Sequence, residues 1–396
     1  MSNYLSQIKT GKVKLSNNFS NGINVIFTGD FCPTAVPTDA LLKKTTVKAI
    51  FGDLYEIIHD SDFSITNLEC PLTASNESIK KIGPNLKAGP EVATLLKEAG
   101  FNMMTLANNH IFDYGQRGLL DTLQALQQNG LSYVGAGLSL QEARKPMYLE
   151  IKDVKLAIVN FAEIEYSCAE PEHGGANPMN LIDNFNQIQE ARNHAAHILV
   201  IVHGGHEHYH YPSPETLKRY RFYAEAGASA VIAHHTHCIG GYEKHKGVPI
   251  FYSLGNFFFP TKDKMPSLWH EGYAVLLRIS ADNLDFEILP YEQCKDGTLT
   301  VDTRLSGEIT EKINGISRIL ADEKQLALKW KKFVEERHQY YLTKISGFGR
   351  YKTAILRRLG LLNYFYRETQ LENVKQMLRC EAHKEAALEI VSTYLK

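Results

Sequence analysis

Short apolar runs alternate with amphipathic segments along most of the chain. The runs are rich in β-branched and aromatic residues and are bounded by Gly, Asn, Asp or Pro, which predicts buried strands at 23–28, 62–67, 102–107, 156–162, 198–203, 229–233 and 249–253. Helical periodicity predicts helices at 90–100, 116–130 and 213–227, the last opened by Ser213 and closed by Gly227. This alternation predicts a layered α/β fold.

The pattern changes after about residue 305, where strand patterns stop and helical periodicity with interleaved charge takes over. We therefore predict three parts: a polar N-terminal lead-in at 1–22, an α/β domain at 23–299 and a helical C-terminal region at 300–396. Within the last part, residues 344–367 contain six Lys or Arg, no acidic residue and many aromatic and leucine residues. This composition favours a packed helix pair with a basic exposed face. Peripheral contact of 344–367 with an anionic membrane surface or with a protein partner is the alternative.

Composition limits the class of protein. With 44% hydrophobic and 22% charged residues, the 396-residue chain is in the ordinary globular range. The net charge of -1 provides no field that would favour nucleic acid, so we expect no nucleic-acid partner. No apolar run reaches the roughly 18–20 residues that span a bilayer, and the polar N-terminus has no signal-peptide core. The six cysteines are scattered, which favours reduced thiols and a cytoplasmic location, with the inner membrane face as the site of any peripheral contact.

Polar residues gather where the predicted strands end. Five strands run into Asp, Glu, Asn or His, at Asp30, at 67–69, at 108–110, at His203 and at 234–237. Ligands of open α/β sheets bind at the carboxyl ends of strands. Carboxylates, amides and imidazoles together suit Mn, Fe or Zn, so the pattern predicts a metal site. Taken singly, the Asn pair at 108–109 is also typical of a turn, and 203–212 of a solvated loop.

Six motifs occur in an order and spacing that identify a family. GDF (29–31), NLE (67–69), NNHIFDYG (108–115), HGGHEHY (203–209), HHTH (234–237) and YSLGNFFF (252–259) resemble the bacterial poly-γ-glutamate capsule synthesis (CapA-type) family, which belongs to the calcineurin-like metallophosphatase superfamily. The resemblance covers about 23–260. It implies a four-layer α/β/β/α sandwich with a C-terminal helical appendage outside the match, and two divalent metal ions between two sheets.

The resemblance also implies roles for individual residues. It implies metal ligands at Asp30, Glu69, Asn109, His203, His235 and His237, with Glu69 in the bridging position. It implies catalytic roles for His110, which would contact the leaving group, and for Glu207. Orientation of the ligands or contact with substrate is implied for Asn67, Asp113, His206 and Asn256.

The sequence departs from the family pattern in several places, of which Cys32 bears most on the metal site. Many members have a His where this chain has Cys32, which leaves the first metal site short of a ligand and leaves open whether one or two ions bind. A cysteine that follows a buried strand is more often a small buried core residue than a metal ligand.

The implied function is metal-dependent hydrolysis of a phosphoester or related bond by hydroxide generated at the metals, in the synthesis of a capsule or surface polymer. The substrate would be an anionic small molecule or polymer. One alternative is a non-hydrolytic accessory protein that binds an anionic polymer or a lipid-linked intermediate. Another is hydrolysis or transfer at an amide bond of a γ-linked polymer, which the family name alone suggests.

Overall fold

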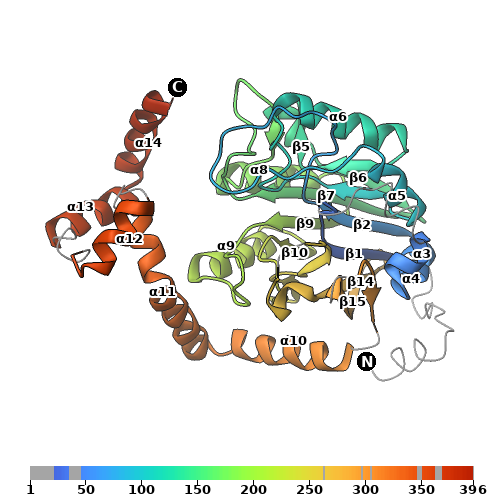
Figure 1. The fold of residues 1–396 in the computed structure, drawn as a ribbon. Coiled ribbons are helices and arrows are strands. Elements are labelled where there is room, and N and C mark those ends of the chain that lie inside the picture. The colour runs from blue at the N-terminus through green and yellow to red at the C-terminus, as the bar shows by residue number, and fades with distance from the viewer. Residues whose placement is uncertain are drawn as a thin grey trace. The chain divides into compact units, whose positions relative to one another are not determined.

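A computed structural model describes residues 22–34, 46–261, 264–295, 298–303, 306–345, 350–361 and 368–395 (Figure 1). The predicted lead-in, apart from residue 22, lies outside the described residues. The chain divides into two compact units, Met1–Ala327 and Leu328–Lys396. The predicted domain limits at 23–299 and 300–396 stay predictions.

Two large β-sheets form the first unit within its described residues. The larger sheet has the order β16-β15-β14-β1-β2-β3-β4, and β13 also pairs with β1. Strands β1 to β4 and β13 pair in parallel with one another, whereas the pairings of β1 with β14, β14 with β15 and β15 with β16 are antiparallel. The bounds are β1 Ile23–Phe31, β2 Phe63–Leu68, β3 Met103–Thr105, β4 Ser132–Val134, β13 Asn256–Phe258, β14 Glu271–Ile279, β15 Leu284–Gln293 and β16 Val301–Asp302.

The smaller sheet has the order β11-β12-β10-β9-β7-β6, with parallel pairing between β7, β9, β10 and β12. Its bounds are β6 Met147–Ile151, β7 Val154–Ala162, β9 His197–His203, β10 Ala230–His234, β11 Tyr242–His245 and β12 Val248–Phe251. A short pair is formed by β5 (Ala136–Gly137) and β8 (Gly175–Ala176). All seven predicted strands are therefore confirmed, with ends that shift by a few residues. Strands β14 and β15 were not predicted.

Side chains alternate between two faces of each sheet, and this alternation builds three cores. Val25 in the larger sheet and Leu199 in the smaller sheet belong to a shared core between the sheets. Their neighbours Ile26 and Val200 point to the outer faces, where helices cover them. The result is an α/β/β/α sandwich, which confirms the predicted fold (Figure 1).

Helices α3 to α6 contribute to the outer core of the larger sheet, and α8 and α9 to that of the smaller sheet. Helix α9 begins where the sequence predicted, because the Ser213 hydroxyl accepts a hydrogen bond from the Thr216 backbone N–H. The bounds are α3 Val47–Phe51, α4 Leu54–Asp60, α5 Val92–Glu98, α6 Gly115–Gln128, α7 Leu140–Ala143, α8 Leu181–Arg192, α9 Pro214–Glu225 and the 3₁₀ helix η1 Ser267–His270.

The regular elements described after residue 305 are all helical. Helix α10 (Ser306–Leu320) belongs to the first unit and buries Ile309, Ile313 and Leu320 there. The second unit contains most of α11 (Glu323–Ile345), followed by α12 (Arg350–Arg358), α13 (Glu368–Arg379) and α14 (Glu381–Leu395). Among the described residues, we find no helix that combines the length and the apolar character needed to cross a membrane.

Candidate metal centre

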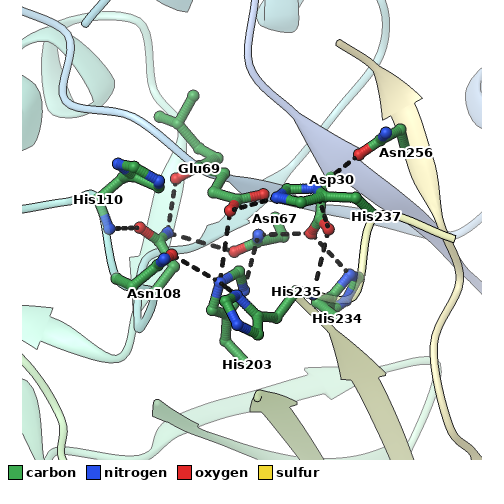
Figure 2. A network of polar contacts seen from close by, with 12 residues as sticks. Asp30, Asn67, Glu69, Asn108, His110, His203, His234, His235, His237 and Asn256 are labelled. Carbon is green, nitrogen blue, oxygen red and sulfur yellow. Dashed lines mark hydrogen bonds and ion pairs between the residues drawn. The ribbon is translucent and has the colours of Figure 1, made fainter. Parts of the chain in front are cut away.

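The carboxyl ends of strands from both sheets meet at one cluster of polar side chains (Figure 2). Strand β1 contributes Asp30, and Glu69 follows the last residue of β2. From the smaller sheet, His203 ends β9, and His235 and His237 follow β10. The two sheets thus bring together residues separated by up to about half of the chain. This arrangement follows from parallel strands ending at the same edge of each sheet.

Among the described residues, two groups have the composition and spacing of metal sites. One is Glu69, His203 and His235, and the other is Asp30, Glu69 and His237; in each group the ligand atoms lie within 4.8 Å of one another. Glu69 belongs to both groups. Its position therefore fits the bridging role that the family resemblance implies.

The environment of the Glu69 carboxylate shows most clearly that a cation fits between the two ligand groups. Its side chain is fully buried, and within the described part of the chain neither of its oxygens has a hydrogen-bond partner. A buried carboxylate without a partner is strongly unfavourable unless a cation or a proton compensates it. Burial raises the pKa of Glu69 well above its ordinary value, and the nearby Asp30 and Glu207 charges raise it further. Two divalent cations would supply the missing compensation.

The group around His203 converges on one ring nitrogen. His203 Nε2 lies 3.0 Å from Asn109 Oδ1, 3.1 Å from His235 Nδ1 and 3.5 Å from Glu69 Oε1. The Asn109 side chain also lies near Glu165, whose pKa burial raises and Asn109 partly lowers. Burial lowers the pKa of His203, and that of His235 to about 4, which keeps both imidazoles neutral, as metal ligands must be.

Asp30 accepts hydrogen bonds from two donors and lies close to a third polar group. Asn67 Nδ2 donates to Oδ1 at 2.7 Å, the His235 backbone N–H donates to Oδ2 at 3.1 Å, and His234 Nδ1 lies 3.2 Å from Oδ1. Burial alone would raise the pKa of Asp30, but His234 and the other imidazoles lower it far below its ordinary range. Asp30 is therefore an ionised carboxylate, the form that binds a metal.

The orientation of His237 is fixed by Asn256. Asn256 Nδ2 donates to the Trp269 carbonyl at 3.0 Å, so its Oδ1 must be the atom that faces His237 Nδ1, also at 3.0 Å. His237 Nδ1 is then the protonated ring nitrogen, and Nε2, which lies 3.6 Å from Glu69 Oε1, keeps its lone pair. Outer partners of this kind set the tautomer of histidine ligands in metalloproteins.

The predicted leaving-group residue lies in a second network next to the cluster. His110 Nδ1 lies 2.7 Å from Asp113 Oδ2, and Asp113 also accepts a hydrogen bond from the Leu86 backbone N–H at 2.7 Å. Lys81 forms an ion pair with Asp113 and lies 3.1 Å from His110 Nδ1. The Lys81 side chain is only 4% exposed. Asp113 therefore links the metal-binding loop to residues 79–86 of the preceding long loop.

Sequence reasoning missed two residues of this site. Lys81 is one, because it lies in a segment without regular structure and no spacing distinguishes it from the neighbouring Lys80. His234 is the other, although the HHTH motif that contains it was recognised. The signal for His234 was present, since it ends β10 directly beside a predicted ligand.

The remaining predicted residues lie in the segment that follows β9. Glu207 is exposed and His206 is half-buried. The charge of Glu207 acts on Glu69 and on His235, which places it near the cluster, but no described contact tests its catalytic role. Asn67 and Asn256 touch predicted ligands directly, and Asp113 touches His110. The roles of all the predicted site residues stay predictions, although the structure brings the six predicted ligands together.

The backbone of the last histidine motif is strained. His235 has a φ of 96° and His237 a φ of 53°, a region that non-glycine residues rarely adopt. Such strain persists where surrounding structure enforces it and is concentrated at functional sites. In this backbone conformation the imidazoles of His235 and His237, only two residues apart, both lie close to the Glu69 carboxylate.

Cys32 follows β1 and is fully buried in the core under α3 and α4. Burial raises the pKa of its thiol, which also contacts Cys70. Neither candidate metal group among the described residues includes Cys32. The interpretation of Cys32 as a core residue fits this environment, and the group of Asp30, Glu69 and His237 has three candidate ligands without it.

The sandwich and the shared buried carboxylate define an α/β/β/α protein with a candidate two-metal centre. Residues 24–261 match the family model described as bacterial capsule synthesis protein PGA_cap. The chain belongs to this family, which confirms the resemblance seen in the six motifs.

Relatives of this chain include two proteins named for capsule or polymer synthesis. The chain is 32% identical over 244 residues to the capsule biosynthesis protein CapA of Bacillus anthracis, a match of 57% of this chain and 59% of that protein. It is 30% identical over 262 residues to the PGA biosynthesis protein CapA of Bacillus subtilis, covering 65% and 68%. The match thus spans less than two thirds of the first of these relatives.

A third relative is a probable polyglutamine synthesis accessory protein of Mycobacterium tuberculosis, 29% identical over 222 residues, with 52% of this chain and 58% of that protein covered. Among solved structures, a 5'-nucleotidase from Candida albicans shares 12% identity, with a TM-score of 0.40 and coverage of 80% of this chain and 57% of that one. A likeness this distant carries no argument about function.

Proposed function

We propose that this chain is a metal-dependent hydrolase that acts on a phosphoester or related bond during the synthesis of a capsule or a poly-γ-glutamate-like surface polymer. The observation that carries the proposal is the fully buried Glu69 carboxylate, which is shared by two groups of candidate metal ligands. The process is suggested by the family and by the names of the Bacillus relatives. A cytoplasmic location remains a prediction.

The two ligand groups would hold two divalent ions, with Mn, Fe or Zn favoured by the mixture of carboxylate, amide and imidazole donors. Asp30, Glu69 and His237 would hold one ion, and Glu69, Asn109, His203 and His235 the other. When bound, such a pair activates water as a nucleophile and stabilises the charge that develops on the oxygens of the reacting group. This chemistry favours an anionic substrate, either a small molecule or a polymer.

His110 would handle the proton of the leaving group. Because Nδ1 faces Asp113, Nε2 is the ring nitrogen available to pass a proton to the leaving oxygen. Asp113 fixes the orientation of the ring, and Lys81 fixes the orientation of Asp113. Asn67 and Asn256 orient Asp30 and His237, whereas we assign His206 and Glu207 to contact with substrate.

The test is turnover of p-nitrophenyl phosphate and bis-p-nitrophenyl phosphate with added Mn²⁺. Glu69→Ala and His235→Ala should lose turnover and metal content together. His245→Ala is the matched control, because this imidazole pairs with Glu225 on the surface and should leave both unchanged. Full activity in a metal-free preparation, or normal turnover by Glu69→Ala, would overturn the proposal.

A second candidate function is that of a non-hydrolytic accessory protein, in which the same centre binds an anionic polymer or a lipid-linked intermediate. The Mycobacterium tuberculosis relative, which is named a probable polyglutamine synthesis accessory protein, supports this candidate. Metal-loaded protein that binds poly-γ-glutamate and turns over neither phosphoester substrate would favour the accessory role. Release of shorter polymer chains would instead indicate hydrolysis of the amide bond.

A further inference from the structure

Helix α12 carries a row of apolar side chains on its exposed side. Tyr351 is 86% exposed, Ile355 59% and Leu359, just beyond the last helical residue, 62%. Spacings of four residues place all three on one side of a helix. Single exposed apolar residues are common on protein surfaces, but an aligned row of large ones marks an interaction surface.

Basic residues flank this row on both sides. Lys352 and Arg358 are exposed and lie three residues before and after Ile355, so each is about 60° around the helix from it, in opposite directions. Residues 350–361 contain four Lys or Arg and no Asp or Glu. The opposite side of the helix is buried at Thr353, which fixes the apolar row on the outward side.

We propose that α12 binds an anionic lipid surface, with the apolar row at the boundary between headgroups and acyl chains and the flanking cations at the lipid phosphates. An apolar face edged by Lys and Arg is typical of helices that lie in a membrane interface. Tyr351 suits the interfacial layer, which favours amphipathic aromatic rings. Long basic side chains reach up from the apolar face to the phosphates.

Charge favours lipid over a protein partner. Anionic lipid attracts every basic residue at once without matching geometry, with a contribution of about fivefold in partitioning per Lys or Arg. A protein partner would have to place acidic side chains opposite these cations and a matching apolar groove against the row, whereas anionic lipid supplies both without matched geometry. The predicted contact region at 344–367 also includes 346–349 and 362–367, which lie outside the described residues, so the proposal rests on 350–361 alone.

Helix α13 supplies a matched control. Leu378 is 65% exposed, as prominent as Ile355, but its helix carries Glu368 and Glu372 as well as basic residues. A charge introduced at Leu378 should therefore leave binding to anionic lipid unchanged.

The test is co-sedimentation of the full chain with vesicles of phosphatidylcholine alone and of phosphatidylcholine with phosphatidylglycerol. The wild type should bind the anionic vesicles at least about tenfold more strongly, and 0.5 M salt should weaken that binding. Ile355→Asp should reduce it about tenfold or more, and Lys352→Glu with Arg358→Glu about 25-fold or more. Leu378→Asp should bind as the wild type does.

Circular dichroism and thermal unfolding verify that each variant is folded, so the binding result does not depend on the proposed catalysis. Equal binding to neutral and anionic vesicles, absence of binding by the wild type, or wild-type binding by folded Ile355→Asp would each overturn the proposal. Absence of vesicle binding would turn attention to a protein partner for the same surface.

Discussion

Lys81→Met tests the network that holds His110. The substitution keeps most of the aliphatic stem and removes the ammonium group that pairs with Asp113. An exposed ion pair contributes about 0–1 kcal/mol, so losing one is barely measurable. This pair is different, because the two side chains are 4% and 0% exposed.

Removing one partner of a buried pair leaves the other charge uncompensated, at a cost of about 3–5 kcal/mol. Asp113 would keep its contacts with His110 and with the Leu86 backbone N–H, so we expect the lower end, about 3 kcal/mol. That is a large part of a typical unfolding free energy of about 5–15 kcal/mol.

The assay is urea denaturation with a metal chelator present, followed by circular dichroism. The double variant Lys81→Met with Asp113→Asn removes both charges, and we expect it to lose less stability than the sum of the two single variants. A loss below about 1 kcal/mol in Lys81→Met, or an additive double variant, would refute the idea of a buried, coupled pair.

Three further outcomes are expected. Asn256→Ala should weaken metal binding about 10–100-fold by releasing His237, as measured by calorimetric titration, and an unchanged affinity would contradict the orienting role. Mn²⁺ at about 1,000 times its Kd should raise the unfolding free energy by about 4 kcal/mol in the wild type and far less in Glu69→Gln. Burial raises the pKa of Glu243, but hydrogen bonds from Arg221 and Tyr252 hold that pKa below its ordinary value of 4.5. The interaction between Glu243 and Arg221 therefore stabilises the fold above about pH 4.5. This stability is lost as the pH falls through the pKa that Glu243 has in the folded protein. The stability difference between wild type and Glu243→Gln should accordingly shrink from pH 6 to pH 3, and a constant difference would show that Glu243 does not titrate as described.

Much of the sandwich could be predicted from the sequence because its central strands are parallel and buried on both faces. Such strands are short continuous apolar runs, and their boundaries are marked by polar residues. Strand β15 (Leu284–Gln293) was missed because apolar residues alternate with Asp and Glu in its first half. The residues of this half are only partly buried or exposed, so the sequence shows no continuous apolar run there. Strand β14 lies after the last motif and is almost entirely apolar, so its sequence carried a strand pattern that was not used.

The candidate ligands could be predicted because each one directly follows or ends a strand, so topology alone brings them to one edge. The partners that orient them follow no such rule. Lys81 reaches Asp113 from a long loop whose path depends on tertiary contacts. Side-chain contacts between loops leave no periodic signal in a sequence.

Elemental analysis of the purified protein, without added metal, tests the central claim most directly. If Glu69 is the shared ligand of two cations, the wild type should carry about two ions of Mn, Fe or Zn per chain, and Glu69→Gln almost none. Glu163→Gln, a change at a nearby carboxylate outside both ligand groups, should keep the wild-type content. Wild-type protein without metal, or an equal content in Glu69→Gln, would contradict the account.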